Sequence, residues 1–517
     1  MEGVLVSAKK AASTIAITVV SDAQGRYVFP RTKLEPGQYS VRIRAVGYEL
    51  DDPGPVEVGA EKTASADLKL RKARDVSAQI TNTEWLMSMP GTDDQKAALL
   101  ACVNCHTLAR VIKSSHDAEE FLQVAKRMGE YANQSTPLKP QRRKAERILE
   151  TRGEQREQAQ RRLAEYLASV NLSNGPSFAY DLKTLPRPKG KATRVIMTEY
   201  DLPRATIQPH DAILDPRGPA PGMVWYSNFG EQNIGRLDPK TGQVTEYAVP
   251  ELKPGWPVGE LGLRSGPDGG LWMGMMFQGG IARFDPRTEK FQTWSAPPEF
   301  NRDMTQINMA SPDRADVDGK VWTQNNGFAV IHRMELATGK IETFEPFKTT
   351  KPGENHNIYD VIPDSHNNAF FTDFANEHIG KVDAKTGKVS LWPTPTRNSA
   401  PRRGQMDAQD RLWFGEYRGN HVGMFDTKTE KFQEWEAPTP WSAPYDVFLD
   451  KNGDAWTGSM TSDRVLRLNT KTGQFTEYLL PRSTNIRRVF VDDSTTPVTF
   501  WVGNNHGASI VKLEPLE

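Results

Sequence analysis

The chain has 517 residues, which is enough for about three domains of ordinary size. Basic and acidic residues both number 65, so the zero net charge gives no indication of a nucleic acid or an anionic membrane as a partner. No apolar run approaches the roughly 18 residues of a membrane-spanning helix, so we expect no transmembrane segment. The 40 glycines, 36 prolines and 12 tryptophans favour a multidomain, mainly β protein with many turns.

Residues 1–70 predict a small antiparallel β-sandwich. Strand patterns occur in GVLVSAKK, STIAITVVSD, RYVFP and LEPGQYSVRIRAVGYEL, with turns at Ala23-Gln24-Gly25 and Pro36-Gly37. Lys9-Lys10 and the apolar stretch behind it have the look of a signal peptide. The strand pattern that follows and the missing small-residue cleavage site argue against one.

This segment resembles the carboxypeptidase regulatory-like domain, which implies no catalysis. The resemblance rests on Asp22, Gly25, Tyr27, Phe29, Pro36, Gly37, Tyr39, Gly47 and Tyr48. Because that family usually has one more strand before EGVLVSA, we expect the supplied start to lie inside the domain. Three aromatic side chains could bind a glycan, but packing in the core is the simpler interpretation: Tyr27, Phe29 and Tyr39.

The two cysteines of the chain lie together in Cys102-Val103-Asn104-Cys105-His106. This spacing is typical of covalent haem c attachment, in which each thiol binds one vinyl group and the histidine becomes the proximal iron ligand. A disulfide redox pair would not explain the adjacent histidine. A structural zinc site would need more cysteines or a second histidine nearby. The motif therefore predicts haem c.

A polar linker (71–81) separates the sandwich from three predicted helices. The first spans Asp93–Leu108, the second follows Asp117 as N-cap, and the third ends in RRLAEYLASVNLS. The haem motif on the first and the apolar pattern on the last resemble the class I cytochrome c fold, so residues 82–175 are expected to form an all-α haem domain. In that family the sixth iron ligand is usually a methionine, which implies Met128. The alternatives are His116 and an open iron.

From residue 190 to 517 the chain repeats itself. An aromatic residue that enters a strand recurs every 43 to 50 residues, at Trp225, Trp272, Trp322, Phe370, Trp413, Trp456 and Trp501. One four-stranded unit at this period indicates a β-propeller with seven blades. The last unit lacks its outer strand, and residues 192–203 (ATRVIMTEYDLP) match the missing piece, so we expect this strand to close the ring.

The blade pattern resembles virginiamycin B lyase, the streptogramin-inactivating propeller. That family holds a divalent cation, usually Mg²⁺, with glutamates on one propeller face, and a histidine acts as base in opening a lactone by elimination. Only Trp413-Phe414-Gly415-Glu416 keeps a glutamate in the matching column, and no Glu-x-His motif occurs in it. The lyase activity is therefore not carried over to this chain.

Two columns of residues are predicted to face the central channel. Three residues after each blade aromatic lie Asn228, Met275, Asn325, Asp373, Glu416, Ser459 and Asn504. At the inner strands lie His210-Asp211, Gly259-Glu260, Asn308-Met309, Tyr359-Asp360, Arg402-Arg403, Tyr445-Asp446 and Arg487-Arg488. Such a polar ring is where propellers bind small molecules. For each residue, hydrogen bonding to neighbouring backbone or to water is the alternative.

Within these columns we assign chemical roles by residue type. Asp373 and Glu416, in adjacent blades, could share a Mg²⁺ or Ca²⁺ ion. The candidates for acid–base work are His210, His356, His421 and His506. The candidates for binding a carboxylate or phosphate are Arg402, Arg403, Arg487 and Arg488.

The sequence favours a periplasmic c-type cytochrome that transfers electrons to or from a redox partner, such as another cytochrome or a dehydrogenase. In this interpretation the propeller binds a small organic substrate or the partner. Haem is attached outside the cytoplasm, so a signal peptide is expected although none is present. The alternatives are a metal-dependent C–O lyase that acts on a lactone or ester, with the haem domain as an accessory, and a non-catalytic binding scaffold.

Overall fold

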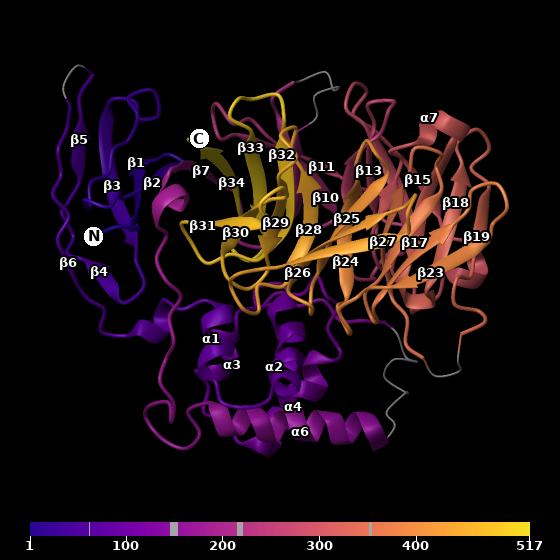
Figure 1. The fold of residues 1–517 in the computed structure, drawn as a ribbon, viewed down its shortest axis with the longest axis horizontal. Helices are drawn as coiled ribbons and strands as arrows, with labels where there is room; N and C mark the ends of the chain where they lie inside the picture. The colour runs from indigo at the N-terminus through magenta and orange to yellow at the C-terminus, as the bar shows by residue number, and fades with distance from the viewer. Residues whose placement is uncertain (61–62, 145–153, 215–220, 351–353, 517) are drawn as a thin grey trace.

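The computed structural model describes residues 1–60, 63–144, 154–214, 221–350 and 354–516. Figure 1 shows an N-terminal β domain beside a large β-propeller, with a layer of helices against one face of the propeller. Within the described ranges, no helix is long and apolar enough to cross a membrane.

The N-terminal domain is the antiparallel β unit that the sequence predicts. Its strands are β1 (Leu5–Lys10), β2 (Ile15–Val20), β3 (Gly37–Arg44), β4 (Tyr48–Leu50), β5 (Val56–Val58) and β6 (Leu70–Lys72). The sheet order is β2-β1-β3-β5, and β4 pairs with β6. Tyr39 is buried and Tyr27 and Phe29 pack on the core, so none of the three is a free glycan platform. The expected strand over residues 26–30 does not form; Pro30 has no N–H to give to a ladder.

Six propeller blades are separate four-stranded antiparallel sheets. Blade 1 has β8 (Pro209–Leu214), β9 (Val224–Asn228), β10 (Asn233–Leu237) and β11 (Val244–Ala248); blade 2 has β12 (Leu263–Ser265), β13 (Leu271–Gly274), β14 (Gly280–Asp285) and β15 (Lys290–Ser295). Blade 3 has β16 (Ala310–Ser311), β17 (Lys320–Asn325), β18 (Val330–Glu335) and β19 (Ile341–Phe344). Short helices in and between these parts are η3 (Gly190–Thr193), η4 (Pro298–Phe300), α7 (Ala315–Asp318) and η5 (Asn326–Phe328).

The remaining separate blades follow the same order. Blade 4 has β20 (Ile358–Pro363), β21 (Ala369–Asp373), β22 (His378–Val382) and β23 (Val389–Pro393). Blade 5 has β24 (Pro401–Met406), β25 (Arg411–Glu416), β26 (His421–Asp426) and β27 (Lys431–Glu436). Blade 6 has β28 (Pro444–Leu449), β29 (Ala455–Ser459), β30 (Arg464–Asn469) and β31 (Gln474–Leu479).

The seventh four-strand unit closes the ring but is not a separate blade. β32 (Ile486–Asp492), β33 (Thr499–Asn504) and β34 (Ser509–Pro515) continue into β7 (Val195–Asp201), as the sequence predicts. The far edge of β7 then pairs with β2, so the unit belongs to one eight-stranded sheet with the N-terminal domain. The expectation of seven separate blades was therefore wrong. The reason is physical: β7 would otherwise expose a row of unpaired backbone groups.

Residues that face each other on the second and third strands of a blade compensate each other in size. Where the second strand carries an aromatic ring, the third strand has glycine opposite it: Tyr226 faces Gly235, Phe371 faces Gly380 and Phe414 faces Gly423. A Cβ at Gly423 would lie 2.6 Å from the Phe414 ring. Where the second strand carries a residue smaller than an aromatic one, the third strand carries a residue larger than glycine, as in the pairs Thr457 with Leu466 and Val502 with Val511. Each pair fills one slot of the core.

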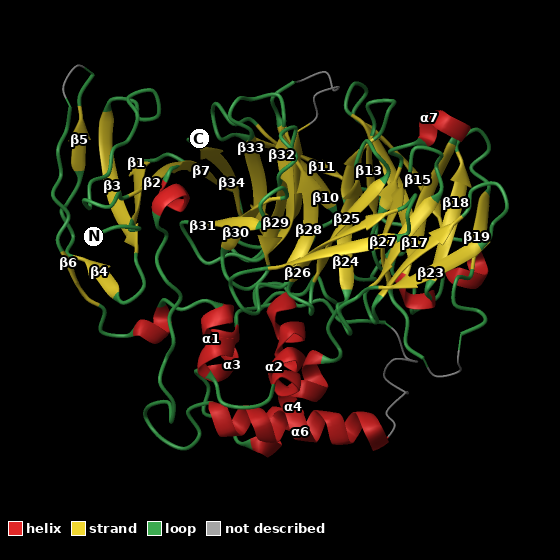
Figure 2. Cartoon of the chain, in the orientation of Figure 1, coloured by secondary structure: helices red, strands yellow, loops and turns green. Residues whose placement is uncertain are grey.

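The helices between the two β regions form what we call the helical cap (residues 76–170). It contains η1 (Val76–Ala78), α1 (Asn82–Ser88), α2 (Asp93–Ala98), η2 (Leu99–Asn104), α3 (Leu108–Ile112), α4 (Ala118–Met128) and α6 (Glu154–Val170). Capping boxes begin α1, α2 and α4, which confirms the N-cap predicted at Asp117. The single helix expected over residues 93–108 is instead divided into α2 and η2. Figure 2 shows these helices gathered beneath the propeller.

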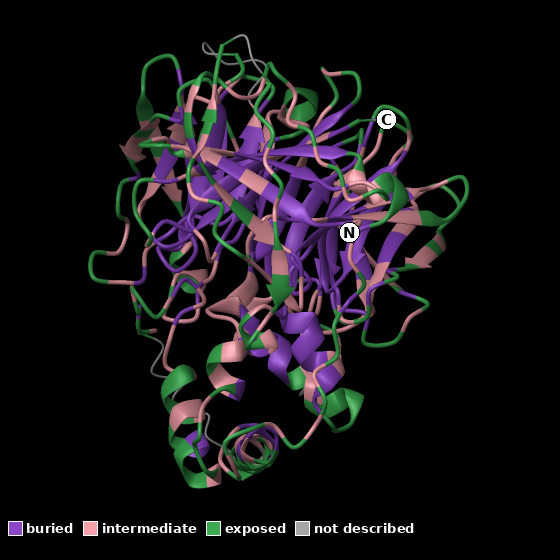
Figure 3. Ribbon diagram, turned by 90° about the vertical axis from the view of Figure 1, so that its left-hand side faces the viewer, coloured by how far each residue is buried: buried purple, intermediate pink, exposed green. Residues whose placement is uncertain are grey.

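The cap is not a separate all-α domain, which corrects the expectation for residues 82–175. One buried cluster joins Leu100, Val103 and Leu108 of the cap to Tyr417 and Tyr445 of the propeller. Figure 3 shows buried helical turns directly against the propeller and exposed ones farther away. Polar contacts reinforce the seam: the Thr83 N–H donates to the Thr461 carbonyl at 3.1 Å, and Gln141 accepts from the Val258 N–H at 2.8 Å.

Candidate functional site

The Cys-x-x-Cys-His motif lies in the seam between the cap and the propeller. Cys102 is in η2 and Cys105 follows it, with both thiols free and the Cys105 N–H directed at the Cys102 carbonyl at 3.4 Å. Burial raises the pKa of the Cys102 thiol to about 11 and also raises the pKa of Cys105. His106 is next in the chain; its Nδ1 lies 3.1 Å from the Thr107 carbonyl, and burial lowers its pKa.

Four hydrogen bonds tie the backbone of this motif and its helix to the propeller. Asn485 donates to the Val103 carbonyl at 3.0 Å, and Tyr417 donates to the Leu100 carbonyl at 3.2 Å. The Asn104 carbonyl accepts from Arg487 at 2.8 Å and lies 3.2 Å from His506 Nε2. The motif is therefore held in one position relative to the end of β25 and to the unit formed by β32, β33 and β34.

Below the motif, the inner strands present two rings of side chains. The first, which we call the cap-side ring, consists of His210, Leu261, Asn308, Tyr359, Arg402, Tyr445 and Arg487. The second, the deep ring, consists of Asp211, Gly262, Met309, Asp360, Arg403, Asp446 and Arg488. Leu263 pairs with Met273 as Ala212 pairs with Tyr226, so Leu261-Gly262, not Gly259-Glu260, occupy these positions in blade 2.

The polar members of the cap-side ring contact one another. The hydroxyls of Tyr359 and Tyr445 share a hydrogen bond, and His210 Nε2 lies 3.0 Å from the Tyr445 hydroxyl. His210 Nδ1 lies 2.8 Å from Asp211, and burial lowers the pKa of His210 to about 3. Both nitrogens of the predicted acid–base residue His210 are thus engaged in structure, and its imidazole is neutral at ordinary pH.

Arg402 lies in a cage of aromatic rings. Its guanidinium carbon is 3.9 Å from the Tyr445 ring centre, 4.5 Å from Tyr417, 4.6 Å from Phe374 and 4.7 Å from Tyr359. A desolvated guanidinium gains roughly 2 kcal/mol or more from such a contact. The side chain is buried, and its Nε has no hydrogen-bond partner among the described residues.

The deep ring is a closed network of ion pairs. Arg403 makes a bidentate contact to Asp211 at 2.7 and 3.0 Å, and Arg488 reaches the same carboxylate at 2.8 Å. Arg264 pairs with Asp360 at 2.7 Å. Asp446 is also buried, which raises the pKa of its carboxyl to about 7. The arginines predicted here as ligand-binding groups, Arg403 and Arg488, are committed to structural pairs.

Blade 4 holds a cluster of one aspartate and two histidines. His356 Nδ1 lies 2.7 Å from Asp373, the His356 ring stacks on Phe347 at 3.8 Å, and its Nε2 has no hydrogen-bond partner in the described part of the chain. His378 Nδ1 lies 3.8 Å from the same carboxylate, and its interaction with Asp373 raises the pKa of His378. Asp373 therefore orients histidines, an arrangement suited to proton transfer.

Blade 5 holds a second acidic group. Glu416 is buried with neither carboxylate oxygen hydrogen-bonded in the described chain, and His421 Nδ1 lies 3.6 Å away. Burial, followed by the charge of Glu434, raises the pKa of Glu416 to about 9. Glu434 was not among the predicted site residues, because it lies on the outer strand β27 and not on the first or second strand of the blade. Its signal is the repeated outer-strand glutamate of QEWEAP.

The two predicted cation ligands, Asp373 and Glu416, have different neighbours. Asp373 contacts His356 and His378, while Glu416 lies near His421 and Glu434. Across the described ranges, no group of three or more His, Cys, Asp or Glu side chains is placed to hold a metal ion. Glu416 with its orphaned oxygens is the residue that best fits a cation, and it would first have to lose its proton.

The candidate sixth haem ligands lie at the surface of the cap. Met128 ends α4 and its side chain is 39% exposed. His116 Nδ1 lies 3.4 Å from Glu120 and is exposed. No contact between either side chain and His106 occurs among the described residues.

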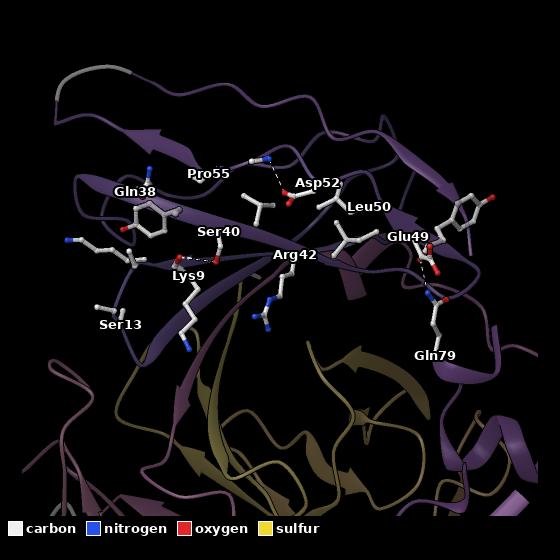
Figure 4. Close-up of a pocket in the computed structure, with 18 residues that line it drawn as sticks. Lys9, Ser13, Gln38, Ser40, Arg42, Glu49, Leu50, Asp52, Pro55 and Gln79 are labelled. Carbon is white, nitrogen blue, oxygen red and sulfur yellow. Dashed lines mark hydrogen bonds between the residues drawn. The ribbon is translucent and has the colours of Figure 1, made fainter. Parts of the chain in front are cut away.

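A groove in the N-terminal domain has a volume of about 990 Å³. Figure 4 shows Ser40 and Arg42 of β3, Lys9 of β1 and Glu49 of β4 along it. Its charged groups are mostly paired on the surface, as in Lys9 with Asp201 and Lys10 with Glu35 at 2.9 Å. It lacks the buried, unpartnered groups of the cap–propeller seam.

Comparison with known proteins agrees with this architecture. A family model described as the carboxypeptidase regulatory-like domain matches residues 1–71, and one described as the virginiamycin B lyase family matches residues 254–514. No curated protein matches the chain.

Two solved structures similar to the propeller are a streptogramin B lyase, with 21% identity and a TM-score of 0.52, and virginiamycin B lyase from Staphylococcus aureus, with 22% identity and a TM-score of 0.51. They cover 63% and 62% of this chain and 99% of their own chains. At this identity they show the fold alone. Because the lyase family model spans about half of the sequence, the chain belongs to the virginiamycin B lyase family.

Proposed function

We propose that this protein is a c-type haem protein that transfers electrons, with the haem held over the propeller at Cys102, Cys105 and His106. The observation that carries the proposal is the pair of free thiols on one helical turn, followed by a histidine and fixed by the propeller. When bound, haem would supply one-electron chemistry at iron.

The side chains around the motif fit this group. Neither cysteine forms a disulfide; Cys102 is in η2 and Cys105 directly follows that helix. The Thr107 carbonyl beside His106 Nδ1 can orient that ring and leave Nε2 for iron. Arg487, His506 and Asn485 hold the carbonyls of Val103 and Asn104 and so keep the loop in place. We retain Met128 as the expected sixth ligand.

The proposal includes a redox partner protein and a location outside the cytoplasm, where haem is attached to cysteines. The hydrogen bonds from the propeller to the carbonyls of Val103 and Asn104 support the proposal, because they would fix the position of the haem motif. We further propose that the propeller face recognises a small organic molecule or the redox partner.

The test is the absorption spectrum of the purified full chain in alkaline pyridine, produced in a host that matures cytochromes c. We expect a c-type spectrum that survives acid–acetone extraction and disappears in the Cys102→Ser/Cys105→Ser variant. A protein that carries no covalent haem under these conditions overturns the proposal. Screening small organic compounds for reduction of the haem would then identify the substrate.

A second candidate is a metal-dependent lyase that opens a lactone or ester. The specific observation in its favour is Glu416, a buried glutamate with unpartnered oxygens beside His421 and Glu434, in a chain of the virginiamycin B lyase family. A divalent cation there would polarise the ester, and the free nitrogen of His356 or His421 could take a proton.

This candidate predicts turnover of a streptogramin lactone that stops on chelation, returns with Mg²⁺ and is lost in Glu416→Gln. Arg283→Gln, a change in an exposed ion pair of blade 2, is the matched control. Turnover that is indifferent to chelation, or absent with Mg²⁺ present, excludes this activity.

A further inference from the structure

The two rings beneath the haem motif differ in their balance of charge. In and beside the deep ring, each of the arginines 264, 403 and 488 forms an ion pair with at least one of the aspartates 211, 360 and 446. In the cap-side ring, Arg402 and Arg487 are both buried, and neither forms an ion pair with a described residue. Two buried guanidinium charges of the cap-side ring therefore have no counter-charge from the described chain, and one of them, Arg487, donates to the motif at the Asn104 carbonyl.

The groups that surround these arginines are neutral. Arg402 donates to the Met460 sulfur at 3.5 Å and to the Tyr359 hydroxyl at 3.3 Å. Arg487 donates to the Asn485 side chain and to the Asn104 carbonyl. Burial keeps the pKa values of His210 and His506 at about 3, so neither imidazole is charged near neutral pH. Burial also raises the pKa of the Glu260 carboxyl.

Unpartnered polar atoms gather in the same seam. The side chains of Gln134 and Glu260 are completely buried, and none of their polar atoms has a partner in the described chain. Asn505 Oδ1 and His506 Nδ1 are likewise unpartnered. A third arginine, Arg143 on the cap side, donates to the Tyr131 carbonyl and to the side-chain oxygen of Asn133 and has no ion pair with a described residue. Burial raises the pKa of the Cys105 thiol, and the positive charges of Arg487 and Arg143 lower it in part.

A buried cation without a partner is costly, and planar guanidinium groups match carboxylates in particular. We propose that Arg402 and Arg487 receive the carboxylates of an anionic ligand in the cap–propeller seam, beside Cys105. The carboxylates have two possible sources. They are either the propionates of a haem on Cys102 and Cys105, which rests on the proposed function, or a free organic acid that enters the seam.

The sign of a stability change tests this proposal. Removing a buried cation that has an anionic partner destabilises a protein, whereas removing an unpaired one stabilises it. We would measure melting temperatures of Arg487→Gln in the haem-loaded full chain and in the haem-free Cys102→Ser/Cys105→Ser chain. Succinate would serve as probe, with sodium chloride at equal ionic strength. Arg42→Gln, a change at an exposed arginine of β3, is the control.

If haem propionates are the ligand, Arg487→Gln lowers the melting temperature of the loaded protein by about 2 °C or more and raises that of the haem-free protein. If a free acid is the ligand, succinate raises the melting temperature of the haem-free parent saturably and does not do so in Arg487→Gln. Arg487→Lys, which keeps the charge, should retain most of either response.

The proposal is overturned if Arg487→Gln raises the melting temperature in every preparation and succinate has no effect beyond that of chloride. A preparation that never acquires haem would refute the proposed function, and the succinate arm would then decide the carboxylate site by itself.

Discussion

Asp211 is the residue on which the deep ring depends most. Its carboxylate accepts from Arg403 and Arg488, lies 2.8 Å from His210 Nδ1, and accepts from the Leu263 N–H at 2.9 Å. These groups lie in blades 1, 2 and 5 and on β32, so one side chain links inner strands around the ring. Asp211→Asn keeps the shape and removes the charge.

The expected cost follows from what remains after the change. Two buried guanidinium groups lose their closest counter-charge, and removing one partner of a buried ion pair costs about 3–5 kcal/mol. Burial disfavours ionisation of Asp211, but the charges of Arg403 and Arg488 outweigh it and lower its pKa well below the usual range. Asp211→Asn therefore removes a negative charge that the arginines hold in its ionised form.

Urea unfolding followed by tryptophan fluorescence measures this cost. The matched control is Asp268→Asn, which breaks the exposed pair with Arg283 and should cost about 1 kcal/mol or less. If Asp211→Asn shifts the unfolding transition no more than the control does, the deep ring does not hold the inner strands together and the reasoning is wrong.

Three further predictions concern other parts of the fold. Gly423→Ala should lose about 1–3 kcal/mol because its new Cβ meets the Phe414 ring, whereas Gly59→Ala, with nothing within 4 Å, should be nearly neutral in the same urea titration. Burial raises the pKa of Glu416 to about 9, so the folded state keeps a proton that the unfolded chain releases near its ordinary pKa, and the stability of the fold falls as pH rises from about 5 to 9. Glu416→Gln should flatten that decline. An unchanged slope would refute a buried neutral acid. Glu84→Ala should destabilise the cap by about 1–3 kcal/mol, because its buried carboxylate accepts from the N–H groups of Thr81 and Leu185; hydrogen exchange in α1 that matches the parent would contradict this.

The propeller could be predicted because each blade repeats one aromatic residue and one turn at a fixed period. The closing strand could be predicted for the same reason, since residues 192–203 carry the outer-strand pattern and β7 does pair with β34. The pairing of β7 with β2 could not, because an edge strand carries no sequence mark of what covers it. In blade 2 the inner strand is short, and the repeat alone placed the ring position at Gly259-Glu260 instead of Leu261-Gly262.

The sequence predicted which residues line the site better than it predicted how they are arranged in space. Arg402, Arg487 and His210 were identified as channel residues, and they do line the cap-side ring. The helical pattern around the haem motif could not show that Leu100 and Val103 pack on propeller tyrosines, because an apolar side chain does not specify its partner. The expectation of a separate helical domain failed for that reason.

The sheet shared by β2 and β7 also determines how the cap is attached. The chain leaves this eight-stranded sheet after β5 and returns to it at β7, so in topological terms the cap is an insertion between two strands of one sheet. A single backbone cut within the cap would leave the N-terminal fragment joined to the ring by β2, and the fragment carrying β7 joined to it as well. Covalent continuity of the cap is thus not required for the two halves of the protein to remain one particle.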